Sequence, residues 1–207
     1  MPIEQDRSQQ RHEQILEAAT RIFSRKGYHD AAMDDIAVES RTSKGGLYFH
    51  FPNKQTLFLA LLDQMIALLR ARAEAAIAEE EDPIRKAEAA LRVVLHTFAS
   101  HRTLAQLFLV EALAAGREFQ ERLAASHAAF AGLVQSHLDD AVRQGVIPPQ
   151  DTALAGQVWF GALNEVVTAW LLREPPGPLE EQYPALRALL LRSVGVPPTG
   201  LVPGGPR

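Results

Sequence analysis

Residues 33–54, MDDIAVESRTSKGGLYFHFPNK, decide the expected fold, because they describe two short helices joined by a tight connection. Asp34 and Asp35 lie in the first turn of a helix expected at 33–40, where the helix dipole favours negative charge. Ser43 can cap a second helix, which Pro52 ends. With a preceding helix at 8–26, closed by Lys26 and a glycine, the stretch predicts a three-helix helix-turn-helix unit.

The second short helix has the residue types that a DNA-reading helix needs. A glycine inside a helix costs about 1 kcal/mol relative to alanine, so Gly45 and Gly46 indicate a close approach of the backbone to a partner. Tyr48 and His50 offer donors to phosphates or base edges. Lys54 and the free amides of the next helix are expected to clamp a phosphate.

The rest of the chain is also expected to be helical, since alanine, leucine, glutamate and arginine dominate and no β-branched alternation occurs. The periodicity and the breakers predict helices at 54–80, 83–100, 102–114, 117–144, 151–173 and 179–194. The fold class is therefore all-α. We expect a DNA-binding domain at 1–53, a larger ligand-binding and dimerisation domain at 54–196 and a flexible tail at 197–207.

Composition excludes several classes of function. The 207 residues contain 47% apolar residues and no cysteine, which excludes disulfides and thiolate-bound zinc. The net charge of −4 comes from the residues after 55, whereas the charged residues of 40–55 are all basic. The polar N-terminus does not match a signal peptide, and no apolar run reaches the ~18 residues of a membrane helix. We expect a cytoplasmic protein without a membrane partner.

No catalytic or metal-binding set is expected. The later histidines are scattered and lack an acidic residue at metal-ligand spacing. We expect them to lie on the surface or to form hydrogen bonds within the protein: His96, His101, His127 and His137. We therefore expect no catalytic residues, no metal, no cofactor and no enzymatic activity.

Asn164 and Glu165 lie in the most apolar of the expected helices, 151–173. Burying an unpaired amide or carboxylate is costly. Either these side chains pair across an interface or they hold the polar end of a ligand. Helices 151–173 and 179–194 are expected to form a four-helix interface in a homodimer.

The stretch that starts at Ile15, ILEAATRIFSRKGYHDAAMDDIAVESRTSKGGLYFHFPNKQTLF, resembles the TetR family of bacterial regulators. The resemblance implies an all-helical homodimer that binds an inverted-repeat, double-stranded DNA operator and releases it when a ligand binds. Carried over by position, it implies DNA contacts at Met33, Thr42, Ser43, Lys44, Gly45, Tyr48, His50 and Lys54.

Two positions depart from the family pattern. Arg41 stands where the family usually has a glycine, and a left-handed backbone there would cost about 1–2 kcal/mol. A phosphate contact by Arg41 would offset part of that cost, so Arg41 joins the expected DNA contacts. Gly46 replaces a small hydroxyl or alanine, so one DNA contact could be missing.

Two later segments, LFLVEALAAGREFQERLAASHAAF and GALNEVVTAWLL, resemble the FadR-like branch of that family, which senses long-chain acyl-CoA. The branch implies a mostly apolar pocket between helices, so we expect a small apolar effector, with long-chain acyl-CoA the leading candidate. The pocket is expected to be lined by Phe98, Phe108, Phe130, Trp159, Phe160 and Asn164. An anionic head group would need a basic residue at the mouth, and the candidates are Arg92, Arg102, Arg117 and Arg122.

The main hypothesis is a repressor that a ligand releases from DNA. The alternative is a helical acyl-chain carrier or enzyme that retains a DNA-binding unit, in which binding or turnover would leave DNA affinity unchanged. An activator or an architectural DNA binder would differ only in promoter context.

Overall fold

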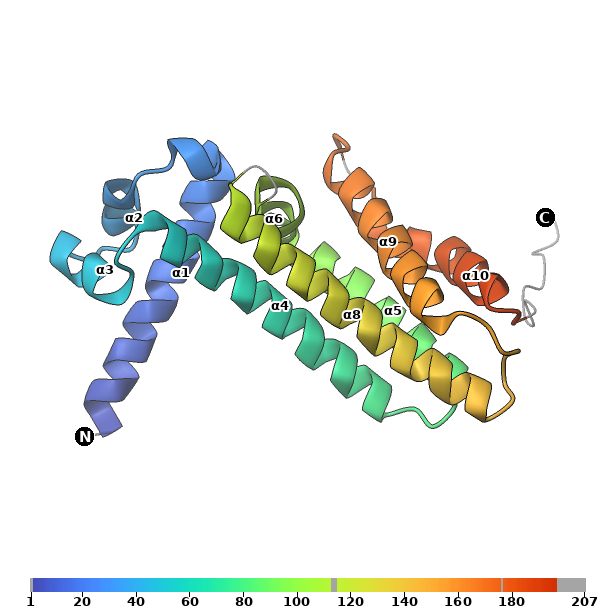
Figure 1. The fold of residues 1–207 in the computed structure, drawn as a ribbon. Coiled ribbons are helices and arrows are strands. Elements are labelled where there is room, and N and C mark those ends of the chain that lie inside the picture. The colour runs from blue at the N-terminus through green and yellow to red at the C-terminus, as the bar shows by residue number, and fades with distance from the viewer. Residues whose placement is uncertain (1, 113–114, 176, 197–207) are drawn as a thin grey trace, which may run out of the picture. The chain divides into compact units, whose positions relative to one another are not determined.

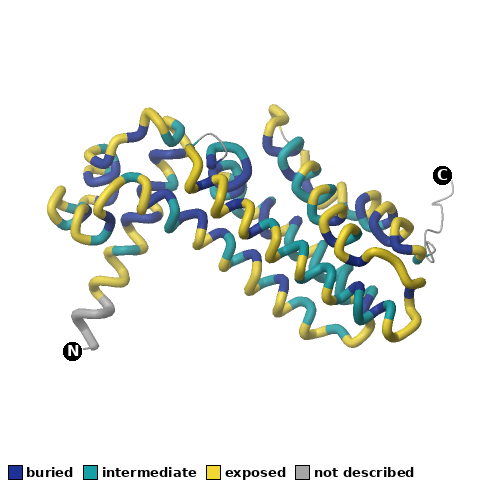
Figure 2. The backbone as a smooth tube through the Cα atoms, in the orientation of Figure 1, coloured by how far each residue is buried: buried dark blue, intermediate teal, exposed yellow. Residues whose placement is uncertain are grey.

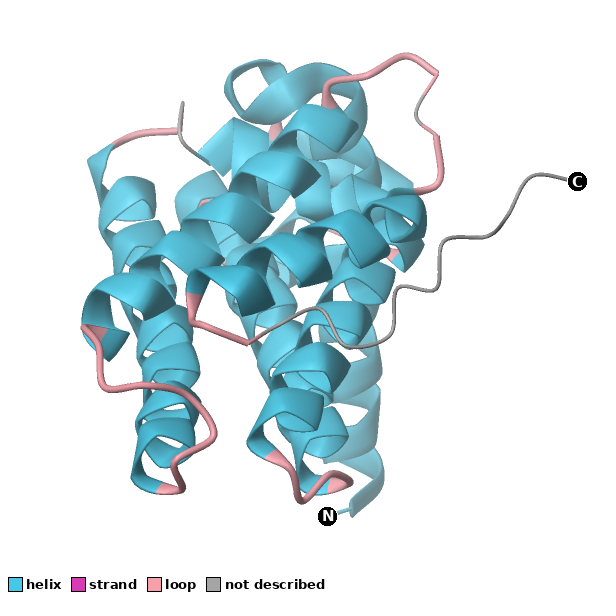
Figure 3. Cartoon of the chain, turned by 90° about the vertical axis from the view of Figure 1, so that its right-hand side faces the viewer, coloured by secondary structure: helices cyan, strands magenta, loops and turns pink. Residues whose placement is uncertain are grey.

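The computed structural model describes residues 2–112, 115–175 and 177–196, so the tail expected at 197–207 lies outside the described residues. Throughout this described part, every regular element is a helix and no strand occurs (Figure 1 and Figure 3). The all-α fold expected from the sequence is confirmed.

The chain divides into two compact units. The first contains Met1–Leu69 and His101–Ala124, and the second contains Arg70–Ser100 and Ala125–Arg207. These units differ from the boundary expected after residue 53. That boundary concerns function rather than compactness, and it stays a prediction.

The first unit is built around the N-terminal helices. Its elements are α1 (Pro2–Asp30), α2 (Met33–Glu39), α3 (Lys44–His50), the start of α4 (Lys54–Ala78), α6 (Arg102–Gln106), a π-helical turn η1 (Leu107–Glu111) and the start of α8 (Arg117–Arg143). α1 packs against α2, α6 and η1, and α2 packs against α3. The single helix expected at 102–114 is thus an α-helical turn followed by a π turn up to Glu111, and its last two positions, 113 and 114, lie outside the described residues.

A glycine marks the end of the regular part of α1. The helix is expected to stop at Gly27, and the structure gives this residue φ 72° and ψ 171°, a conformation open to glycine. A further helical turn follows, up to Asp30. The bend at Gly27 precedes this last turn, which leads into α2.

An aromatic cluster forms the core of the first unit. The ring of Phe58 on α4 lies edge-on to Phe23 of α1 at 5.0 Å and to Phe119 of α8 at 5.2 Å. Tyr28 contacts Phe58 and Phe119. Edge-to-face packing is a favoured arrangement for aromatic rings. It holds α1 against α4, and α2 and α3 lie between these two helices in the sequence.

The second unit consists of the end of α4, α5 (Pro83–Ser100), most of α8, α9 (Thr152–Leu171), a 3-10 turn η2 (Leu179–Gln182) and α10 (Tyr183–Ser193). α10 packs against α5 and α9. Figure 2 shows buried and exposed residues alternating along these helices.

α8 and α9 approach closely at a glycine. A Cβ on Gly156 would lie 2.6 Å from the carbonyl oxygen of Ala131, so only glycine allows this packing. Among the described residues, no helix is long and apolar enough to cross a membrane.

Candidate functional site

The short helix α3 is capped as its sequence predicts, and two buried side chains anchor it. The Oγ atom of Ser43 accepts a hydrogen bond from the amide of Gly46 at 3.1 Å, which satisfies one of the free amides at the helix start. Leu47 and Phe51 are almost completely buried. These two side chains hold one face of α3 against the core and leave the opposite face outside.

Phe49 dominates the outer face of α3. Its side chain is 82% exposed, and at 100° per residue it lies opposite the buried Leu47. Gly45, one turn earlier on the same line, has no atom within 4 Å of the place of a Cβ. Sequence analysis missed Phe49, although its spacing of four from Gly45 and two from Leu47 already indicated an outward position.

The two glycines of α3 occupy different surroundings, so each has its own structural explanation. Gly45 leaves open space, which permits a partner to approach the backbone. A Cβ on Gly46 would lie 3.0 Å from a side-chain carbon of Thr42 and 3.1 Å from Ser43 Oγ. Gly46 therefore accommodates the cap of its own helix. The expected approach of the backbone to DNA stays a prediction for Gly45, where the space is open.

Lys44 and Tyr48 flank this outer line. The ammonium of Lys44 lies 2.9 Å from a carboxylate oxygen of Asp34, with both side chains about two-thirds exposed. The hydrogen bond to Asp34 raises the pKa of Lys44. An exposed pair of this kind contributes little stability, so Lys44 can exchange Asp34 for a phosphate at small cost.

The turn between α2 and α3 is left-handed at Arg41. Its φ of 53° confirms the conformation considered from the sequence. The following residue, Thr42, donates its amide to Ala37 O at 2.9 Å. Glu39, at the end of α2, binds both Arg21 and Arg25 of α1. These bonds fix the turn against α1, while the side chain of Arg41 stays exposed.

Met33 and Lys54, two of the residues expected to contact DNA, have side chains that contact the protein itself. The side chain of Met33 is buried, so only its backbone amide at the start of α2 can face a phosphate. The ammonium of Lys54 donates to the carbonyl oxygens of Tyr28, His29 and Ala31 at 2.7, 2.9 and 2.9 Å. This geometry gives Lys54 a structural role that the sequence analysis missed, and it argues against a phosphate clamp.

His50 ends α3 in a half-buried position. Its ring lies edge-on to His12 of α1 at a centroid distance of 6.0 Å. Burial, and then the charges of His12 and Arg11, lower the pKa of His50. A neutral imidazole can still donate one hydrogen bond to a phosphate.

The residues expected to line a ligand pocket are distributed over α5, η1, α8 and α9. Phe130 of α8 stacks on Phe160 of α9, with centroids 6.2 Å apart and planes 9° apart. Asn164 follows Phe160 by one helical turn and is half-buried. Trp159 instead donates its indole N–H to Ser193 of α10 at 3.1 Å. These residues belong to the second unit.

The remaining two residues, Phe98 and Phe108, come from other helical elements. Phe98 is buried on α5, and Phe108 is buried in η1 of the first unit. Glu165 is exposed on α9, unlike the half-buried Asn164 beside it.

His127 joins the Phe130–Phe160 stack and was not among the expected pocket residues. Its ring lies 4.7 Å from that of Phe160. Burial lowers the pKa of His127. The signal available in the sequence was its spacing of three from Phe130, which places both side chains on one side of α8.

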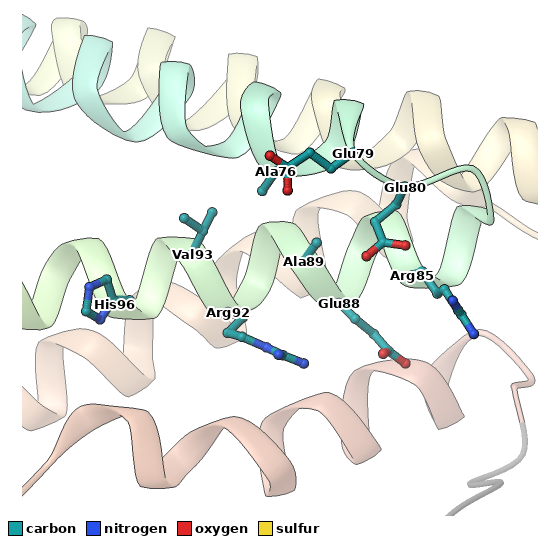
Figure 4. A pocket seen from close by; sticks show the side chains of 9 residues that line it. All are labelled: Ala76, Glu79, Glu80, Arg85, Glu88, Ala89, Arg92, Val93 and His96. Atoms are coloured by element: carbon teal, nitrogen blue, oxygen red, sulfur yellow. The ribbon is translucent and has the colours of Figure 1, made fainter.

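A groove of about 500 Å³ lies between the end of α4 and α5, as Figure 4 shows. It is lined largely by charged residues: Ala76, Glu79, Glu80, Arg85, Glu88, Ala89, Arg92, Val93 and His96. Arg92, one of the four arginines considered for an anionic head group, bonds the hydroxyl of Tyr183 at 3.2 Å and lies over its ring. None of the six expected pocket residues lines this groove.

Comparison with known proteins supplies the family context. Residues 15–61 match the model of bacterial regulatory proteins of the tetR family, and residues 80–182 match a Tetracyclin repressor-like C-terminal domain. The chain is 24% identical over 162 residues to the fatty acid metabolism regulator protein of Bacillus subtilis, covering 78% of this chain and 84% of that protein.

Two solved structures share the fold. The fatty acid degradation regulator FadR from Bacillus halodurans superposes with a TM-score of 0.83 at 24% identity, covering 90% of this chain and 97% of that one. FadR from Bacillus subtilis, solved in complex with stearoyl-CoA, has a TM-score of 0.78 at 23% identity and covers 86% of this chain and 96% of that one.

Proposed function

The chain belongs to the tetR family of bacterial regulatory proteins, and from this premise we propose that it is a repressor released from a palindromic operator by an apolar effector. The family membership makes it a DNA-binding transcription regulator. The direction of regulation, the operator symmetry and the effector are parts of the proposal. Long-chain acyl-CoA is the leading candidate for the effector.

The observation that carries the DNA-binding part is the outer face of α3. Gly45 and Phe49 form its outermost line, with Lys44 and Tyr48 beside them. The major groove admits one helix, in which an apolar side chain can contact a thymine methyl group and donors can bind phosphates. Phe49 replaces Lys54 and the Met33 side chain among the proposed contacts.

An apolar stripe on α9 supports a homodimer. Leu154, Val158 and Leu172 are 55%, 51% and 68% exposed. Their spacing places them on one line along the helix, with the exposed Gly161 and Glu165 between them. Leu189 on α10 is 54% exposed. Large apolar side chains on one face mark an interaction surface, and a two-fold axis would pair the stripe with its copy.

The effector class rests on two supports. The Phe130–Phe160 stack gives the second unit an aromatic site suited to an apolar chain. FadR from Bacillus subtilis, which shares the fold, was solved with stearoyl-CoA. Each additional buried methylene contributes about 0.8 kcal/mol, so such a site favours long chains.

Release follows from a shift between two conformers. An effector that weakens operator binding a hundredfold must prefer the non-binding conformer by about 2.7 kcal/mol. Burial of three or four more methylenes in that conformer supplies this difference. The effect is expected to rise with chain length and then to level off when the site is full.

The experiment titrates a preformed complex of the protein and its operator with acyl-CoAs and free fatty acids of increasing length. The operator is first located by footprinting the DNA upstream of the gene and its neighbours. Half-sites are expected one helical turn apart, about 34–36 Å, or a multiple of that distance. Release by acyl-CoA at a length-dependent concentration supports the proposal. Release by a compact cationic compound, with no response to acyl chains, refutes the effector class.

A further inference from the structure

Two adjacent residues of α8, Ser126 and His127, keep buried polar atoms without partners. Ser126 Oγ and His127 Nε2 are both inaccessible to solvent, and neither has a hydrogen-bond partner among the described residues. The Ser126 side chain belongs to a residue that is only 6% exposed. A buried polar atom without a partner destabilises a protein, so each such atom requires an explanation.

Ser126, like Thr168 of α9, lacks the hydrogen bond that other helical hydroxyls of the described residues make. Thr20 of α1 donates to Leu16 O at 2.9 Å, and Thr97 of α5 donates to Val93 O at 2.7 Å. Such a bond to the carbonyl four residues earlier is the common solution for a helical hydroxyl. Ser136, on the same helix as Ser126, bonds Leu133 O at 2.8 Å. Ser126 makes no such bond, so its hydroxyl is available to another group.

The surroundings of this pair are aromatic. The His127 ring lies 4.7 Å from Phe160, which stacks on Phe130. Phe130 follows Ser126 by four residues and His127 by three, so the three side chains share one side of α8. Asn164 follows Phe160 by one turn and is half-buried. Two unpartnered polar atoms therefore lie beside the stack that the proposed function assigns to an apolar chain.

The chemistry of the pair selects a neutral acceptor. A serine hydroxyl donates one hydrogen bond, and a neutral imidazole donates one from Nε2 when it carries the proton there. Burial lowers the pKa of His127, which favours the neutral ring. A carbonyl oxygen has two lone pairs and can accept both bonds. A carboxylate in the same place would lose its water shell, and neither neutral side chain supplies the positive charge that would offset this cost.

From this geometry we infer that Ser126 and His127 bind the carbonyl oxygen of the effector's acyl thioester. The inference rests on the proposed function, since it assigns the polar subsite of the same effector. It predicts a preference for the thioester over the free acid, because a neutral carbonyl can accept both bonds without a basic residue nearby. The pair lies buried in the apo protein at a cost in stability and obtains its partners when the effector binds.

The test compares stearoyl-CoA with its S-alkyl analogue, in which a methylene replaces the carbonyl. Direct binding to the protein is measured by calorimetry for the wild type, Ser126→Ala and His127→Phe. Phenylalanine keeps an aromatic ring against Phe160. Ser136→Ala is the matched control, because it removes an exposed hydroxyl from the same helix.

We expect the wild type to bind stearoyl-CoA at least tenfold more tightly than the S-alkyl analogue. Each variant is expected to lose most of this difference, whereas Ser136→Ala keeps it. Ser126→Ala is also expected to raise the Tm of the apo protein by about 2–4 °C, because the buried unpartnered hydroxyl is gone. A merely structural serine would lower the Tm instead.

The failures of the two proposals are distinguishable. If stearoyl-CoA dissociates the wild-type complex with DNA but the S-alkyl analogue binds equally well, the carbonyl subsite is refuted and the proposed function stands. Unchanged discrimination in both variants refutes the subsite as well. If stearoyl-CoA does not bind the wild type at all, the acyl-CoA effector itself is refuted.

Discussion

Replacing Lys54 with methionine tests whether this side chain stabilises the fold or binds DNA. Its ammonium donates three hydrogen bonds to carbonyls of residues 28, 29 and 31 at 2.7–2.9 Å. It also lies 4.8 Å from the centre of the Tyr28 ring. Methionine keeps the length and the apolar stem but removes the charge and all three donors.

The contacts allow an estimate of the loss. A buried hydrogen bond to a charged group contributes about 1.5–3 kcal/mol, and a cation over an aromatic ring about 0.5–1 kcal/mol at an exposed site. Lys54 is half-exposed, so water replaces part of each lost bond. We expect the free energy of unfolding to fall by about 2–3 kcal/mol in total, which lowers the Tm by roughly 4–12 °C for a chain of this length.

The assay combines differential scanning calorimetry with operator binding at a temperature where the variant is folded. Lys44→Met is the matched control. Its ammonium pairs with an exposed carboxylate, so we expect weaker DNA binding and an unchanged Tm. A Lys54→Met protein with wild-type Tm and lost operator affinity would overturn the structural role and restore the phosphate clamp.

Three further predictions concern the DNA-reading helix, the dimer and the pH dependence of stability. Phe49→Ala should weaken operator binding about tenfold, as expected for one lost base contact of about 1–3 kcal/mol, and leave the Tm unchanged because the side chain is exposed; equal affinity in a gel-shift titration would exclude a base contact. Leu154→Asp should yield monomers in analytical ultracentrifugation at micromolar concentration, since it places a charge in the exposed α9 stripe, and a stable dimer would exclude that interface. Urea denaturation should show stability falling between pH 7 and pH 5, because burial lowers the pKa of His127 and of His137. As the pH falls below about 6.5, the histidines of the unfolded chain take up protons before those of the folded protein do. The stability that the two neutral rings contribute is therefore complete above that pH and is lost as the pH falls towards their lowered pKa in the folded protein. His127→Phe should flatten this dependence, and an unchanged slope would contradict it.

The helices and the capped DNA-reading segment were predictable from the sequence because they depend on neighbouring residues. Ser43 caps α3 through an amide three positions away. Gly27 ends the regular part of α1, and Arg41 is left-handed where the family pattern has a glycine. Leu47 and Phe51, four positions apart, share one face of the segment, and both are buried. Each of these features is decided within one or two helical turns.

Contacts between helices distant in sequence were decided only by the tertiary structure. Lys54 meets carbonyls that lie 23 to 26 positions earlier, and a lysine at a helix start looks the same in sequence whether it binds carbonyls or phosphate. Helical spacing placed His127 beside Phe130, but only the packing of α9 on α8 brought Phe160 against both rings. The periodicity of one helix shows which residues share a face. The identity of the side chains across that face depends on how two helices align, and that alignment arises from close approaches such as Gly156 on Ala131.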